Sequence, residues 1–125
     1  MITLHYLQCS RSFRILWALE ELGMDYQVEY YQRLPSYAAP ESLKQIHPLG
    51  KAPILVDDEN VIVESAVILD YLQQQYDVKE QFKPQQFKDQ LQYSYWMHYA
   101  EGSLMPLLVM TLVINNVSKH VPWII

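Results

Sequence analysis

Two strand-like segments with a helical segment between them dominate the start of this chain. Residues 2–7 alternate loosely between apolar and polar side chains, and residues 26–31 form a second strand-like segment. Between these two strands, Ser10 and Ser12 offer capping hydroxyls for the start of a helix, and Gly23 is suited to end it. The apolar residues of that helix recur at helical spacing, at Phe13, Ile15, Leu16, Leu19 and Leu22. A strand, a helix and a strand joined in this way form a right-handed crossover between parallel strands, which predicts an α/β fold.

The following residues extend the predicted sheet with a hairpin and two more helical segments. Residues 41–46 predict one or two helical turns, and residues 65–75 predict a helix with one apolar side. Residues 53–56 and 61–63 predict a hairpin, in which the run Asp57-Asp58-Glu59 is interpreted as an ordinary acidic turn. The predicted order is βαβαββα with a mixed four-stranded sheet.

The composition changes after residue 77. We expect a first domain over residues 1–77, a polar linker over 78–86 and a helical segment over 87–125 that holds one long helix and the start of another. Pro106 is expected to kink or tighten the long helix. The apolar run 104–114 is shorter than the roughly 20 residues that a membrane span requires, so no membrane partner is expected.

The boundary between the hairpin and the last helix of the first domain indicates a ligand cleft. Pro53 stands where a strand begins and has no N–H to donate. Glu64 and Ser65 stand where a helix begins, and the free N–H groups and positive dipole end of a helix N-terminus favour an anion. Together they predict a cleft with exposed backbone on one edge and a site for a charged small molecule on the other.

The composition excludes several classes of function. With a net charge of −5 the chain is poorly suited to nucleic acid or an anionic membrane. A single cysteine rules out an internal disulfide, and with no recognisable signal peptide it predicts a reducing, cytoplasmic location. The histidines and the cysteine show no metal-ligand spacing, so no metal is expected.

Four short elements, in this order, resemble the cytosolic glutathione S-transferases, in particular the bacterial serine- or cysteine-type enzymes. They are Tyr6-Leu7-x-x-Ser10-x-x-x-Arg14, His47-Pro48-x-Gly50-Lys51-x-Pro53, Glu64-Ser65-x-x-Ile68-x-x-Tyr71-Leu72 and Trp96-x-x-Tyr99-x-x-Gly102-x-Leu104-x-Pro106. The resemblance implies a thioredoxin-like N-terminal domain followed by an all-α C-terminal domain. Only part of that helical domain fits into this sequence, so we expect a chain truncated in its C-terminal domain.

The resemblance also implies the ligand, which is glutathione as co-substrate. The peptide bond before Pro53 would be cis, and the backbone of Ala52 would bind the cysteinyl part of glutathione. Glu64 would pair with the α-ammonium group of the γ-glutamyl end, and Ser65 with the helix N-terminus would bind its α-carboxylate. Lys51 would add a charge for a ligand carboxylate. Three further candidates have a weaker basis: Gln45, His47 and Arg11.

Two adjacent residues compete for the thiol chemistry. Ser10 lies four residues before Arg14, which resembles the serine-type enzymes, whereas Cys9 resembles the cysteine-type enzymes. A hydroxyl that donates a hydrogen bond to a thiolate lowers the thiol pKa and favours conjugation to an electrophile. A cysteine at a helix N-terminus forms a mixed disulfide with glutathione instead, which favours reductase or thiol-transfer chemistry.

The predicted function is therefore transfer of glutathione to a small electrophile, as in detoxification. The resemblance implies that part of the electrophile pocket is formed by Tyr95, His98, Tyr99, Gly102 and Met105. The alternatives are a glutathione-dependent disulfide reductase that uses Cys9, and a glutathione-binding or interaction module without turnover. The apolar tail 104–125 is expected to associate with another chain, which predicts a homodimer.

Overall fold

The computed structural model describes residues 1–82 and 84–118, which form two compact units, Met1–Lys83 and Pro84–Ile125. The division falls inside the stretch 78–86 that the sequence predicts as a linker. Each unit is described by itself below.

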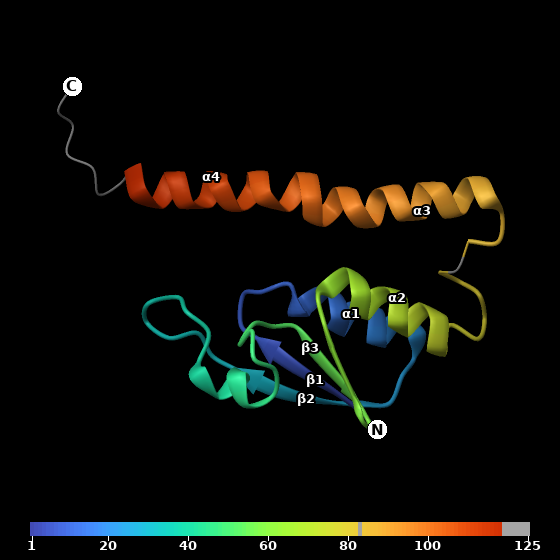
Figure 1. Cartoon of the computed structure of the whole chain (residues 1–125), viewed down its shortest axis with the longest axis horizontal. Coiled ribbons are helices and arrows are strands. Elements are labelled where there is room, and N and C mark those ends of the chain that lie inside the picture. The colour runs from blue at the N-terminus through green and yellow to red at the C-terminus, as the bar shows by residue number, and fades with distance from the viewer. Residues whose placement is uncertain (83, 119–125) are drawn as a thin grey trace. The chain divides into compact units, whose positions relative to one another are not determined.

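The first unit is built on a mixed four-stranded sheet (Figure 1). Its strands are β1 (Ile2–Leu7), β2 (Tyr26–Tyr31), β3 (Ile54–Asp57) and β4 (Asn60–Val63), in the spatial order β2-β1-β3-β4. β1 pairs with β2 in parallel, and the two pairs that involve β3 are antiparallel. The predicted sheet is confirmed, and the fold is that of a thioredoxin-like domain.

Two helices cover one face of this sheet, and a short helix lies near the ends of its strands (Figure 1). α1 (Ser12–Leu22) and α2 (Ser65–Tyr76) are the covering helices, and the 3₁₀ helix η1 (Glu41–Gln45) follows β2. α1 ends as predicted, because Gly23 adopts a left-handed φ of 64° and its N–H bonds to the carbonyl of Glu20. The buried core between the helices and the sheet consists of Ile2, Leu4, Ile15, Leu19, Leu55, Ile68 and Leu72.

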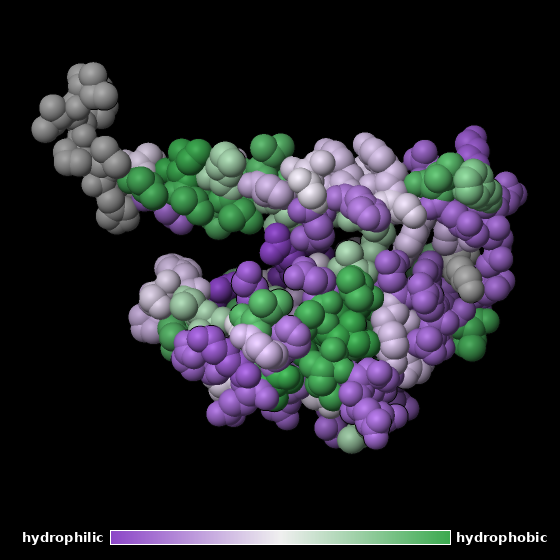
Figure 2. Space-filling view, in the orientation of Figure 1, coloured by the Kyte–Doolittle hydropathy of each residue, from purple (hydrophilic) through white to green (hydrophobic). Residues whose placement is uncertain are grey.

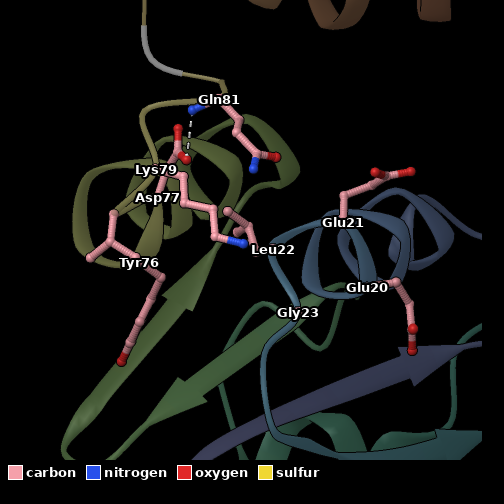
Figure 3. A pocket seen from close by; sticks show the side chains of 9 residues that line it. Glu20, Glu21, Leu22, Gly23, Tyr76, Asp77, Lys79 and Gln81 are labelled. Atoms are coloured by element: carbon pink, nitrogen blue, oxygen red, sulfur yellow. Dashed lines mark hydrogen bonds between the residues drawn. The ribbon is translucent and has the colours of Figure 1, made fainter.

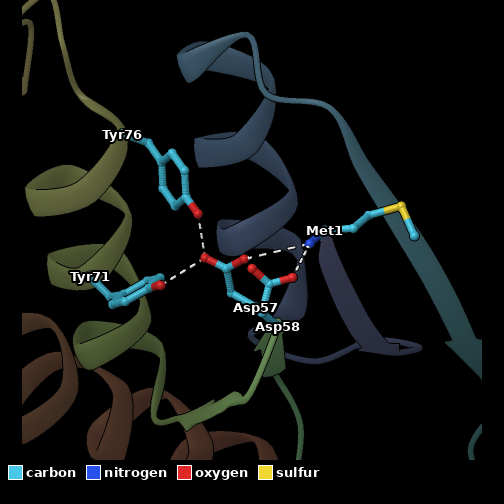
Figure 4. A network of polar contacts seen from close by, with 5 residues as sticks. All are labelled: Met1, Asp57, Asp58, Tyr71 and Tyr76. Atoms are coloured by element: carbon cyan, nitrogen blue, oxygen red, sulfur yellow. Dashed lines mark hydrogen bonds and ion pairs between the residues drawn. The ribbon is translucent and has the colours of Figure 1, made fainter.

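The prediction of an ordinary acidic turn between β3 and β4 is wrong for Asp57. The turn contains only Asp58 and Glu59, so Asp57 stays in the sheet as the last residue of β3, with 6% of its surface exposed. It shares the sheet face of Leu55, toward α2. The hydroxyl of Tyr71 donates to its carboxylate at 2.7 Å, and the hydroxyl of Tyr76 donates to the same oxygen (Figure 4).

The amino-terminus joins this network. The Met1 ammonium lies 2.6 Å from Oδ1 of Asp58 and 4.0 Å from Oδ1 of Asp57. The hydroxyl donors and the nearby ammonium hold the pKa of the Asp57 carboxyl below its usual value, although burial acts in the opposite direction. The network therefore connects the start of β1, the end of β3 and two turns of α2.

The second unit is one helix with an irregular middle. α3 (Phe87–Tyr99) runs into the π-helical turn η2 (Ala100–Leu104), and α4 (Met105–Ser118) follows. We predicted that Pro106 would kink or tighten the helix, but the backbone widens just before it. Proline has no N–H and its ring clashes with the carbonyl four residues earlier, which a wider turn relieves. The predicted start of another helix, and the tail beyond residue 118, lie outside the described residues.

The helix surface changes along its length. Apolar side chains cover most of the visible face of α4, whereas polar side chains are frequent along α3 (Figure 2). By length and composition alone, the helix Phe87–Ser118, with 32 residues and a mean hydropathy of 1.3 in its best window, is sufficient to cross a membrane. The apolar run 104–114, which by itself is shorter than a membrane span requires, forms only part of this helix.

Asp57→Asn should lower the free energy of unfolding at pH 7 by about 1–2 kcal/mol, because it removes the charge that two tyrosine hydroxyls stabilise. The pKa of Asp57 is lower in the folded state than in the unfolded state, so its contribution is present above the unfolded value. It is lost as the pH falls through the folded value. Urea unfolding from pH 7 down to pH 3 measures both.

The matched control is Glu59→Gln, which removes the same charge from the exposed turn between β3 and β4. It should change the free energy of unfolding by less than about 0.5 kcal/mol at either pH. Equal effects of the two substitutions would show that the tyrosine contacts of Asp57 contribute nothing specific.

Candidate functional site

The turn between β1 and α1 is closed by two serine hydroxyls. Ser10 Oγ lies 2.7 Å from the Leu7 carbonyl oxygen and 2.8 Å from Ser12 Oγ, and donates its single proton to one of them at a time. It also accepts a hydrogen bond from the Ser12 N–H at 3.1 Å. Ser12 is fully buried, and its hydroxyl accepts from the Leu7 N–H at 3.2 Å. Ser10 thus closes the turn in addition to any role in chemistry.

Cys9 occupies the exposed side of the same turn. Its φ of 49° is in the left-handed region, which a residue with a side chain adopts only at some cost. Its carbonyl oxygen accepts a hydrogen bond from Nη2 of Arg33 at 3.2 Å. Sequence reasoning missed both Arg33 and the buried role of Ser12, because nothing local in the sequence indicates either contact.

The second predicted element, before β3, lies at the same end of the sheet. The Ala52–Pro53 peptide bond is cis, Pro53 is buried, Ala52 is partly buried and Lys51 is exposed. β3 runs antiparallel to β1 with Ile54 opposite His5, so the residues before Ile54 extend toward the end of β1. The turn with Cys9 and Ser10 leaves β1 at that end.

The end of β4 and the start of α2 lie at the same end of the sheet. β4 pairs with β3 so that Val63 lies opposite Ile54, and Glu64 therefore also follows at this end of the sheet. Glu64, rather than Ser65, occupies the cap position of α2, with an exposed side chain and its carbonyl accepting from the Ile68 N–H at 2.9 Å. Its φ of 71° and ψ of 120° are strained for a residue other than glycine, at a cost of about 1–3 kcal/mol. Ser65 is the buried first residue of the helix.

A buried histidine, His5, is the last residue of β1 that pairs with β3. His5 Nδ1 is 3.0 Å from the Tyr31 hydroxyl oxygen. Burial lowers the pKa of His5 and raises the pKa of Tyr31, so both side chains are neutral near pH 7. The pair therefore adds no charge at this end of the sheet.

The residues predicted to line the electrophile pocket all belong to the second unit. Tyr95 and Tyr99 stack with ring centroids 5.8 Å apart, and the Trp96 ring stands edge-on to both. His98 is exposed, with Nδ1 2.7 Å from the Ser94 carbonyl oxygen. Gly102, in the π-helical turn, and Met105, at the start of α4, lie further along the helix, and nothing in this unit crowds the α-carbon of Gly102.

A cavity of about 130 Å³ lies at the other end of the first unit (Figure 3). It is lined by the C-terminal ends of α1 and α2, including Glu20, Gly23, Tyr76 and Asp77, and contains none of the predicted site residues. Within residues 1–82 and 84–118, no cluster of three or more His, Cys, Asp or Glu side chains is arranged to hold a metal ion.

Comparisons with known proteins agree with this geometry. Residues 1–74 match the family model described as "Glutathione S-transferase, N-terminal domain". "Glutathione S-transferase 3" of Schizosaccharomyces pombe is 44% identical over 110 residues, which cover 86% of this chain and 44% of that protein.

Two solved structures extend the comparison. A glutathione S-transferase crystal structure from Actinobacillus pleuropneumoniae superposes with a TM-score of 0.85 at 42% identity, covering 93% of this chain and 54% of that chain. Ure2p5 from Phanerochaete chrysosporium, cocrystallized with 1-(S-glutathionyl)-2,4-dinitrobenzene, gives 0.69 at 25% identity, with coverages of 84% and 46%. The chain spans about half the length of these relatives. It belongs to the glutathione S-transferase family, of which it carries the N-terminal domain and part of the helical region that follows.

Proposed function

We propose that the first unit binds glutathione and stabilises its thiolate for attack on a small electrophile. One observation carries the proposal. The Cys9–Ser10 turn, the cis bond between Ala52 and Pro53 and the start of α2 at Glu64 all lie at one end of the sheet. The relatives named above are glutathione S-transferases, and this convergence of elements suits an extended, charged tripeptide.

The γ-glutamyl end of glutathione is assigned to Glu64 and Ser65. The exposed carboxylate of Glu64 is placed to pair with the α-ammonium group, while the N-terminus of α2 and the Ser65 side chain favour the α-carboxylate. The strained backbone of Glu64 supports this assignment, because such conformations persist where the surroundings enforce them and they concentrate at ligand sites. The backbone of Ala52 would bind the cysteinyl part, and exposed Lys51 a ligand carboxylate.

The thiolate is assigned to the turn, with Ser10 as the donor. To donate to a sulfur, the hydroxyl must leave the Leu7 carbonyl, at a cost of about 1 kcal/mol, whereas a hydrogen bond to a charged group contributes about 1.5–3 kcal/mol. The exchange is therefore favourable once a thiolate is present. The N–H groups at the start of α1 add to the same effect.

Exposure of the Cys9 thiol on this turn favours a second candidate function. In that reaction the Cys9 thiolate attacks a mixed disulfide of glutathione and a substrate thiol, the substrate thiolate leaves, and the glutathionyl group remains on Cys9 as a mixed disulfide. A glutathione thiolate then attacks that disulfide, Cys9 leaves as the thiolate and glutathione disulfide forms, so the substrate disulfide is reduced and glutathione is oxidised.

The proposal extends to the second unit. Tyr95, His98, Tyr99, Gly102 and Met105 would line one side of the electrophile site, and the exposed aromatic rings there suit an aryl group. Ure2p5 was crystallized with an aryl conjugate of glutathione, which is in keeping with that choice. We further propose a cytoplasmic homodimer with a glutathione domain over residues 1–77, a linker over 78–86 and a helical part over 87–125. A binding module without turnover remains the alternative for a chain that spans half of its relatives.

Ser10→Ala should lower kcat/KM for an aryl halide with glutathione by about tenfold or more, since it removes the hydrogen-bond donor to the thiolate. Cys9→Ala should change it by less than about twofold. Initial rates over a range of aryl halide concentrations, at saturating glutathione, measure both. Loss of activity in Cys9→Ala alone, together with a glutathione adduct on Cys9 by mass spectrometry, would establish the disulfide reaction instead.

Glu64→Gln should weaken the binding of S-methylglutathione by about tenfold, because it removes the charge that pairs with the α-ammonium group. Glu64→Gly should weaken it similarly while raising thermal stability, since glycine adopts a positive φ without strain. Calorimetric titration and thermal melts measure the two effects. Glu59→Gln is the control of equal charge, and an affinity loss as large in that variant would refute the assignment.

A further inference from the structure

Arg33 connects two loops that are distant in the sequence. It lies in the segment that follows β2, and its guanidinium donates to the Gln8 carbonyl at 2.9 Å and to the Cys9 carbonyl at 3.2 Å. A third N–H donates to the Tyr37 carbonyl at 2.7 Å. Three backbone oxygens are thus bound by one side chain, and two of them belong to the turn that carries the proposed thiol chemistry.

The parallel pairing of β1 and β2 explains how Arg33 reaches that turn. Leu7 lies opposite Tyr31, and the Gln8 N–H still donates to the Tyr31 carbonyl at 2.9 Å. The two strands therefore end side by side, and the segments that leave them start next to each other. Arg33 follows Tyr31 by two residues, which places its side chain beside the turn from Gln8 to Ser10.

The turn needs support of this kind. Cys9 has a φ of 49°, and such a conformation in a residue with a side chain persists only where the surroundings enforce it. On one side the Ser10 and Ser12 hydroxyls close the turn. On the other side Arg33 binds the two carbonyls that precede Ser10. The rigid fork of a guanidinium binds adjacent acceptors in a fixed geometry, whereas an ammonium group on a flexible stem has no such preset arrangement of donors.

The loop that contains Tyr37 is closed by hydrogen bonds of its own. The loop 34–38 is closed by hydrogen bonds from the Leu34 N–H to the Ala38 carbonyl at 3.0 Å and from the Tyr37 N–H to the Leu34 carbonyl at 2.8 Å. Tyr37 itself has a φ of 63°. Because Arg33 binds the Tyr37 carbonyl as well, its guanidinium connects this loop to the turn from Gln8 to Ser10.

We propose that Arg33 is a positioning residue of the thiol site. It does not contact the reacting sulfur; it holds the backbone of Cys9, and so directs the Ser10 hydroxyl and the first N–H groups of α1 toward the place of the thiolate. The functional part of this inference rests on the proposed glutathione chemistry. Its structural part, that Arg33 keeps the turn in place, does not.

Hydrogen exchange tests the structural part without any activity. In Arg33→Met, the amides of a peptide that covers residues 8–14 should exchange at least about tenfold faster than in the unsubstituted chain, while a peptide from α2 is unchanged. Lys79→Met is the matched control, because it removes one exposed positive charge at the other end of the unit. It should leave both peptides unchanged. Unaltered exchange of residues 8–14 in Arg33→Met would overturn the proposal.

Kinetics test the functional part. Arg33→Met should lower kcat for an aryl halide near pH 6.5 by about tenfold and bind S-methylglutathione within about twofold of the unsubstituted chain, because the anchors at Glu64 and Ser65 are untouched. The deficit should shrink above a pH of about 8.5, where a free thiol ionises without help. Arg33→Lys, which retains the charge but not the planar fork of donors, should be intermediate.

The outcomes separate this inference from the proposed function. If the unsubstituted chain neither turns over nor binds S-methylglutathione, the proposed function fails, and faster exchange of residues 8–14 in Arg33→Met still supports the role of Arg33 in the turn. If the unsubstituted chain is active and Arg33→Met has the same pH profile, the positioning role in catalysis is overturned. A parallel loss of S-methylglutathione affinity and kcat would likewise overturn it, since it would indicate damage to the whole unit.

Discussion

The antiparallel pairing of β3 with both of its neighbours determines where the candidate site lies. Ile54 is opposite His5 on one side and opposite Val63 on the other, so the end of β1, the start of β3 and the end of β4 meet at one edge. Both covering helices begin at that edge as well, so the positive ends of their dipoles lie there. A shift of β3 by a single residue would turn its buried side chains to the other face and move Pro53 away from the turn.

The polar groups at this edge hold the fold together and are also the ones that we propose for the chemistry. Ser10 closes the turn through Leu7 and Ser12, yet its proton is also the one that a thiolate would attract. Glu64 opens α2 from a strained backbone and still presents an exposed carboxylate. The contacts of Ser10 and the strain at Glu64 affect the stability of the unit, so substitutions at these two residues require a thermal melt beside every activity measurement.

Local patterns in the sequence predicted the strands, the helices and their order, because apolar periodicity and the Gly23 stop are properties of neighbouring residues. The features that were missed depend on contacts between distant segments. The sequence placed Asp57 in an exposed turn, whereas in the structure it is buried and accepts hydrogen bonds from two tyrosines of α2. No local pattern distinguished Arg33, because two of its three backbone contacts are with residues 24 and 25 positions away. Pro106 was recognised as a disruption, but only the surrounding helix decides between a tighter and a wider turn.

The division into two units has a consequence for selectivity. Every residue assigned to glutathione and its thiolate belongs to the first unit, whereas the residues assigned to the electrophile lie on α3, the π-helical turn and α4. Activation of a thiol raises the rate toward any electrophile, while discrimination among electrophiles requires an apolar pocket that buries one better than another. Each buried CH₂ group contributes only about 0.8 kcal/mol, so several pocket walls are needed for strong preference. Under the proposed function, residues of the first unit would therefore set how strongly the thiol is activated, and residues of the second unit would take part in the choice among electrophiles.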